Sequence, residues 1–182
     1  GGISTAFELR RSLSDEHEIV LVDRSPTFVM GLRKLWALVG VGRIADGRRD
    51  LSLLERLGIR YEQREITAID PAARSAVTEA GVLSADYLVV ALGAEARPDL
   101  VPGLVEHGYN PWSVQGVPGL KAALNSFYGG DIVIAIAGMP YTCPPAPFEC
   151  AMLLDHYLRE RGRRERSSIT VTTPKHILLP NA

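Results

Sequence analysis

The chain has 182 residues, of which 46% are hydrophobic and two are cysteines, and its formal net charge is −1. This length and composition suit one large domain, or one and a half smaller ones, with an ordinary core, and the near-neutral charge argues against a nucleic-acid-binding protein. Cys143 and Cys150, with no histidine close to them in the sequence, form neither a disulfide framework nor a metal-ligand pattern, so we expect no metal and assign cysteine function to redox or nucleophilic chemistry.

The first residues resemble half of a dinucleotide-binding motif. Apolar residues follow Gly1-Gly2 at helical spacing, and a short apolar strand at 17–23 ends in Asp23, about 20 residues beyond Gly2. In such a motif a glycine allows close helix–strand packing and the acid accepts ribose hydroxyls. An ordinary β-α-β surface turn explains the pattern equally well. In the dinucleotide interpretation, the first strand and glycines precede residue 1, and the chain is truncated.

Short strands dominate the middle of the chain. Three are expected at 60–63, 65–70 and 75–79, with turns around 71–73 and 80–81, as a small antiparallel excursion. A more apolar strand follows from Ala85 and breaks at Gly93 into an irregular loop. The pattern predicts an α/β fold.

The stretch "IVIAIAGMPYTCPPAPFEC", 132–150, predicts a buried strand running into a helix at 148–158, with a further strand at 168–173. A dinucleotide-binding domain would place a glycine-rich phosphate loop between this strand and the helix. Here Cys143 is followed by three prolines within four residues. Prolines lack the backbone donor that binds phosphate, but they hold a neighbouring thiol at low entropic cost. The loop therefore favours sulfur chemistry over nucleotide binding.

The order of these segments closely resembles the sulfide:quinone oxidoreductase and flavocytochrome c sulfide dehydrogenase branch of the flavoproteins with two dinucleotide-binding domains. The resemblance rests on the Gly-Gly helix, "IVLVDRSPTFVM", "YEQREITAID", "DYLVVALGAEARP" and, most specifically, "CPPAPFE". It implies an α/β fold with two Rossmann-like domains and parallel sheets: a FAD-binding domain at 1–112 that lacks its first strand, and the start of a second domain at 113–182.

The resemblance also implies a set of FAD-binding residues. They are Gly2 beside the pyrophosphate, Asp23 at the adenosine ribose, Arg24 at the adenine, Ile66 through its backbone, and Ala91, Leu92 and Gly93 in the second flavin loop. Leu92 is a departure, because the family usually has threonine or serine there. A side-chain contact is lost at that position, whereas backbone contacts remain available.

In the resembling enzymes the cysteine at the position of Cys143 pairs with a second cysteine from the C-terminal half, which this chain does not contain. Sulfide opens the pair and leaves a persulfide on one sulfur, and the other thiolate passes two electrons to the flavin. Cys143 precedes a helix N-terminus, which favours a thiolate. Glu149 is the candidate proton shuttle, or simply a charge that suits the helix dipole, and Cys150 is interpreted as a small buried hydrophobe.

Three functions follow as alternatives. The first is FAD-dependent oxidation of sulfide with quinone as acceptor, or with a cytochrome. The second is a type II NADH dehydrogenase-like flavoenzyme, and the third is a non-catalytic flavoprotein-like scaffold.

No apolar run approaches the roughly 20 residues that cross a bilayer, and the start lacks signal-peptide features. We therefore expect a soluble or peripheral protein, on the cytoplasmic or periplasmic side. The missing C-terminal part could supply the membrane contact, and the sequence leaves open whether the protein forms an oligomer.

Overall fold

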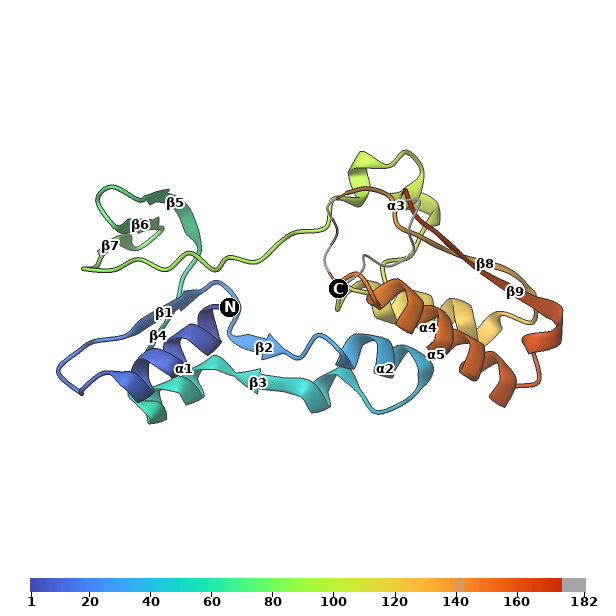
Figure 1. The fold of residues 1–182 in the computed structure, drawn as a ribbon, viewed down its shortest axis with the longest axis horizontal. Helices are drawn as coiled ribbons and strands as arrows, with labels where there is room; N and C mark the ends of the chain where they lie inside the picture. Colours follow the sequence, from blue (N-terminus) through green and yellow to red (C-terminus); the bar gives the residue numbers. More distant parts are fainter. Residues whose placement is uncertain (140, 142, 175–182) are drawn as a thin grey trace. The chain divides into compact units, whose positions relative to one another are not determined.

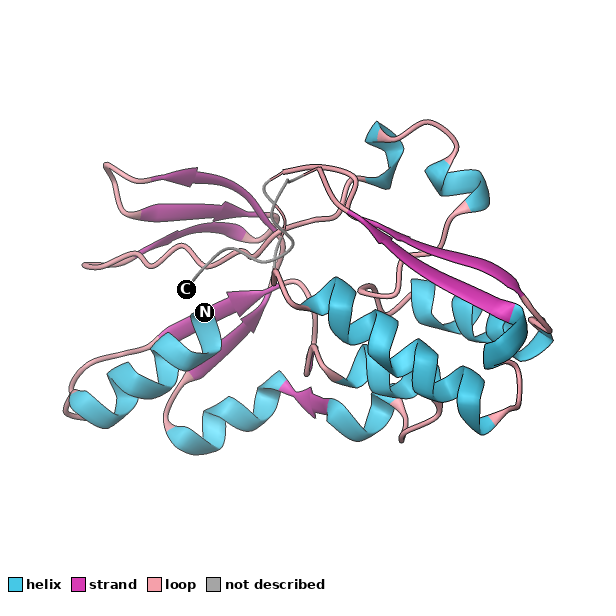
Figure 2. Cartoon of the chain, turned by 45° about the vertical axis from the view of Figure 1, so that its right-hand side comes forward, coloured by secondary structure: helices cyan, strands magenta, loops and turns pink. Residues whose placement is uncertain are grey.

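A computed structural model describes residues 1–139, 141 and 143–174. Its helices and strands follow one another as expected for an α/β protein (Figures 1 and 2). The first of two compact units contains Gly1–Val29 and Arg48–Ala96, and the second contains Met30–Gly47 and the described residues from Arg97 onward. The domain division at residues 112 and 113 stays a prediction.

The first unit is built on two parallel strands. β1 (Val20–Asp23) pairs with β4 (Arg60–Gln63) in a register that places Val20 opposite Arg60 and Asp23 opposite Gln63. Helix α1 (Gly2–Ser12) and the 3₁₀ helix η2 (Leu51–Leu57) pack against them. The buried residues of this core are Ala6, Ile19, Leu21, Leu51, Leu54 and Ile59. The predicted helix and strand at the start of the chain are confirmed.

An antiparallel sheet follows these strands in the same unit. It has the order β5 (Ile66–Asp70), β6 (Ser75–Thr78) and β7 (Gly81–Ser84), and a second antiparallel pair joins β2 (Thr27–Val29) to β3 (Arg48–Asp50). The predicted excursion is therefore present. The strand at 60–63 does not belong to it, because it pairs in parallel with β1, and its Tyr61 packs against the core that contains Leu21.

The strand predicted from Ala85 is not formed. After β7 this segment runs as an irregular chain (Figure 1), and no described strand pairs with it. Without a hydrogen-bonded partner strand, it cannot form a β ladder. Its apolar side chains are consequently exposed, including Tyr87, Val89, Val90 and Leu92.

The second unit places helices on a parallel pair. β8 (Gly130–Ala135) pairs with β9 (Ser167–Thr172), and helix α5 (Ala146–Glu160) connects them. The unit also contains the helical elements α2 (Arg33–Val39), η1 (Ile44–Gly47), η3 (Pro98–Leu100), α3 (Leu104–His107), α4 (Gly116–Ser126) and η4 (Arg164–Arg166). The predicted strand–helix–strand order from Ile132 is confirmed.

Helices α2, α4 and α5 share one core. Leu38 of α2, Val117 of α4 and Leu158 of α5 are almost fully buried in it. Lys121 reinforces the packing by donating from Nζ to the carbonyl of Ala37, at 2.9 Å, near the C-terminus of α2. Within the described residues, none of the helices is long and apolar enough to span a bilayer.

Candidate functional site

The carboxyl ends of β1 and β4 border a hollow of about 310 Å³ in the first unit. Open α/β sheets bind ligands at this edge. Its lining residues are Asp23, Arg24, Arg64, Glu65, Ile66, Leu92, Gly93, Ala94 and Glu95. The structure thus brings five of the predicted cofactor residues around one space. Ligand pockets measure about 300–1,000 Å³, so the hollow suits part of a dinucleotide.

Gly2 and Ala91 lie beside each other at the start of α1. A Cβ added at Gly2 would lie 3.6 Å from the Cβ of Ala91, and one added at Gly1 would lie 3.3 Å from it. The N-terminus of α1 therefore contacts the loop that ends in Gly93. Gly93 itself has φ +79° and open space where its side chain would be, so a ligand can approach its backbone.

Asp23 has the chemistry that a ribose requires. Its Oδ1 accepts a hydrogen bond from the backbone N–H of Ser25 at 2.8 Å, and Oδ2 has no partner among the described residues. The Tyr61 hydroxyl donates to the carbonyl of Ser25 at 2.8 Å and holds this turn. Burial, followed by the charge of Asp23, raises the pKa of Tyr61 and keeps it a donor. One carboxylate oxygen is thus oriented and available.

Two arginines flank this carboxylate, and sequence reasoning missed one of them. Arg24 pairs with Glu65 at 3.4 Å, whereas Arg64 pairs with Glu62 at 2.9 Å. Recognising 60–63 as a parallel partner of β1 would have indicated Arg64 and Glu65, because the carboxyl ends of parallel strands meet at one edge. The donor set fits the adenosine half of FAD: an acid for the ribose and planar cations for the purine.

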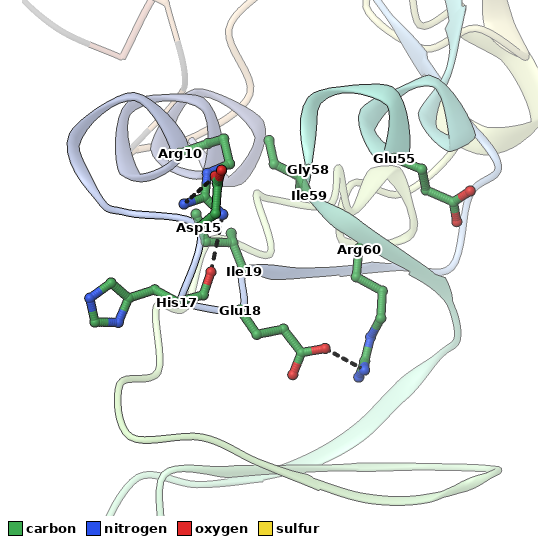
Figure 3. A pocket seen from close by; sticks show the side chains of 9 residues that line it. All are labelled: Arg10, Asp15, His17, Glu18, Ile19, Glu55, Gly58, Ile59 and Arg60. Atoms are coloured by element: carbon green, nitrogen blue, oxygen red, sulfur yellow. Dashed lines mark hydrogen bonds and ion pairs between the residues drawn. The ribbon is translucent and has the colours of Figure 1, made fainter.

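A larger hollow of about 480 Å³ lies at the other, amino-terminal end of the same strands (Figure 3). Arg10 fills one side of it by donating to the carbonyls of Leu13 and His17, each at 3.0 Å, and Arg60 pairs with Glu18 at 2.6 Å. These contacts tie the end of α1 to the strand that follows. The two arginines are thus engaged in structural contacts.

The start of α5, in the second unit, offers few donors to a phosphate. Pro144, Pro145 and Pro147 have no N–H, and the N–H of Ala146 is bonded to the carbonyl of Cys143 at 3.0 Å. The next two N–H groups, of Phe148 and Glu149, both bond to the carbonyl of Pro145. The first turn of this helix has therefore no free donor of the kind that binds a pyrophosphate.

Cys143 is exposed and holds an unusual backbone conformation. Its φ is +56°, in the left-handed region that cysteine rarely adopts. Such conformations cluster at functional sites, where the surrounding structure maintains them. Glu149 lies in the first turn of α5 and is partly buried.

Cys150, in contrast, is buried in the helical core and is only 2% exposed. Burial, with a smaller contribution from the charge of Glu149, raises the pKa of its thiol from 9.0 to about 11. The thiol therefore stays neutral where a solvated thiol ionises, which agrees with its interpretation as a small hydrophobe.

This difference predicts a loss of stability in alkali. The pKa of Cys150 is higher in the folded than in the unfolded state. The contribution of its neutral thiol to the free energy of unfolding is therefore complete below pH 9 and disappears as the pH rises to about 11. Two pKa units correspond to roughly 2–3 kcal/mol. Urea unfolding at pH 8 and pH 11 should show a larger loss for the wild type than for Cys150→Ala, by about that amount. Equal losses would contradict the assignment.

The sequence and the fold are similar to those of known flavoproteins. Residues 119–181 match the family model "Sulfide dehydrogenase [flavocytochrome c] flavoprotein chain, central". The mitochondrial sulfide:quinone oxidoreductase of Dictyostelium discoideum is 30% identical over 91% of this chain and 38% of its own length. A demethylphylloquinone reductase of Synechocystis is 33% identical over 90% of this chain and 42% of its own.

A solved structure shares the fold over almost the whole chain. The sulfide:quinone oxidoreductase from Aquifex aeolicus superimposes with a TM-score of 0.83 at 25% identity, covering 96% of this chain and 42% of the Aquifex chain. The chain thus spans about two fifths of the length of these relatives.

Proposed function

Because the chain belongs to the sulfide:quinone oxidoreductase and flavocytochrome c sulfide dehydrogenase branch of the FAD-dependent pyridine nucleotide-disulfide oxidoreductases, we propose that the full protein oxidises sulfide and reduces a quinone. Bound FAD would accept an electron pair from sulfur and release it to the acceptor. Cys143 is the proposed redox-active thiol, and Glu149 the proposed proton carrier.

In this proposal the first unit holds the adenosine half of FAD. The free carboxylate oxygen of Asp23 accepts a ribose hydroxyl, Arg24 borders the adenine, and the backbone of Ile66 contacts its edge. Gly2, with Ala91, Leu92 and Gly93, lines the approach of the pyrophosphate. The backbone contacts do not require the hydroxyl that Leu92 lacks.

The start of α5 is the observation that carries the sulfide assignment. An exposed thiol stands where a pyridine nucleotide domain needs free backbone donors, and the first turn of the helix has none. This arrangement favours sulfide, acting through the thiol, as the electron donor, and it disfavours NADH, which would need a phosphate-binding loop at this position. A carboxylate in the same turn, Glu149, suits the removal of the proton of HS⁻.

The proposed step conserves atoms and electrons. The sulfur of HS⁻ attacks one sulfur of a disulfide between Cys143 and a cysteine elsewhere in the full protein, and the disulfide bond breaks. A new S–S bond holds the sulfide sulfur as a persulfide, Glu149 takes the proton, and the displaced thiolate leaves with the electron pair of the broken bond. An electron pair would pass to FAD when this thiolate forms a new S–S bond to the persulfide sulfur.

Anaerobic mixing of the full-length protein with sulfide tests this function. The flavin absorbance should bleach, and a short-chain ubiquinone should then restore it with two electrons per flavin. If cytochrome c restores the absorbance and the quinone does not, the acceptor is wrong. A protein that holds FAD but is not bleached by sulfide would contradict the proposed substrate.

A further inference from the structure

A row of alternating charges runs along β4 between the two hollows of the first unit. Glu18 pairs with Arg60 at 2.6 Å, Arg60 pairs with Glu62 at 3.2 Å, and Glu62 pairs with Arg64 at 2.9 Å. Residues 60, 62 and 64 share one face because side chains alternate along a strand. Ile59 and Tyr61, on the opposite face, belong to the core. We call Glu18, Arg60, Glu62 and Arg64 the charge row.

The charge row ends in the hollow that borders Asp23. Arg64 lines this hollow, and its backbone N–H donates to the carbonyl of Asp23 at 3.1 Å, which fixes its main chain beside that residue. Among the residues that the structure describes, Glu62 is the one side-chain partner of the Arg64 guanidinium. A guanidinium has five N–H donors, so most of those on Arg64 stay available to a ligand.

Arg64 is better held than its neighbour Arg24. The Arg64 and Glu62 side chains are 27% and 21% exposed, whereas Arg24 and Glu65 are 72% and 62% exposed. An exposed ion pair contributes little order, but a mostly covered pair that is part of a longer row fixes a guanidinium in one place. A planar cation fixed at the edge of a ligand hollow suits an aromatic ring that also offers nitrogen acceptors.

We propose that Arg64 contacts the purine ring of FAD, and that Glu62 is the residue that positions it. This inference rests on the proposed function, since it assumes FAD in the hollow. The guanidinium stacks on the adenine or donates to its ring nitrogens, while Asp23 accepts the ribose hydroxyl. Arg64 therefore distinguishes FAD from FMN, which has no adenosine.

Flavin titration of the flavin-free full-length protein, followed by fluorescence quenching, tests the inference. Arg64→Met should raise the Kd for FAD about tenfold and leave the Kd for FMN unchanged. Arg64→Lys keeps the positive charge but removes the planar guanidinium, and should raise the Kd for FAD about threefold. This variant provides the test if Arg64→Met does not fold. Glu62→Gln should raise the Kd for FAD to an extent similar to that of Arg64→Lys, and should leave the Kd for FMN unchanged.

Two matched variants calibrate the assay. Arg11→Met removes an exposed arginine of α1 that pairs with Glu8, and should leave both flavin affinities unchanged. Asp23→Ala should weaken FAD by about tenfold to a hundredfold, because charge-assisted hydrogen bonds are lost. If Asp23→Ala weakens FAD while Arg64→Met and Arg64→Lys bind it like the wild type, the role of Arg64 is overturned alone. A wild-type protein that binds no FAD would overturn the proposed function as well.

Discussion

Replacing Cys143 by serine should abolish the reduction of the flavin by sulfide while FAD and the fold are retained. A serine hydroxyl does not ionise near neutral pH and cannot form a disulfide, so neither persulfide formation nor electron transfer through this residue can occur. The rate constant for bleaching by sulfide should fall by a factor on the order of 10³ or more, as for the loss of other nucleophiles. Anaerobic stopped-flow absorbance measures it directly.

Cys150→Ser is the matched control, because it makes the same chemical change on the buried thiol of α5. This variant should lose some stability but keep the bleaching rate of its folded fraction. The reverse pattern, with Cys150→Ser inactive and Cys143→Ser active, would exchange the roles of the two sulfurs. If both variants reduce their flavin normally, the disulfide mechanism is wrong.

NADH and NADPH should reduce the flavin at least about a hundredfold more slowly than sulfide at equal concentration. The first turn of α5 offers no free backbone N–H to a pyrophosphate, since prolines or internal hydrogen bonds occupy each position. Two missing charge-assisted hydrogen bonds of roughly 1.5–3 kcal/mol each account for this factor. Stopped-flow mixing of the same preparation with each donor tests it, and rapid bleaching by NADH would favour the NADH dehydrogenase-like alternative.

Local sequence patterns predicted those helices and strands whose residue spacing or apolar run lies within one uninterrupted segment of the chain. The helix after Gly2, the strand ending in Asp23 and the strand–helix–strand order from Ile132 were all recognisable from spacing and apolar runs. Pairing partners were harder to predict. The sequence does not record that 60–63 lies parallel to β1, because a four-residue strand fits either direction equally well.

The same limit explains what was missed at the site. Arg64 and Glu65 gain significance only when the ends of β1 and β4 are brought together, so no local motif marks them. The segment after Ala85 shows the opposite error. Its composition favours a strand, but a strand forms only with a partner, and among the described residues this segment has none.

The unusual backbone conformation of Cys143 could not be predicted from the sequence either. The prolines indicated a stiff loop, but their fixed φ values concern their own positions and not that of the preceding cysteine. The exposure of this thiol and the burial of Cys150 agree with the difference between the two cysteines that the sequence suggested. Their chemical roles stay predictions.

Helix α2 has a consequence for how the protein is made. Its residues Leu35 and Leu38 are buried by α4 and α5, which the ribosome completes much later than α2. At the usual rate of synthesis the delay is on the order of ten seconds, during which an apolar surface of the nascent chain has no native partner. A chaperone that binds emerging polypeptides should therefore engage this segment, and a product that stops before α5 should aggregate.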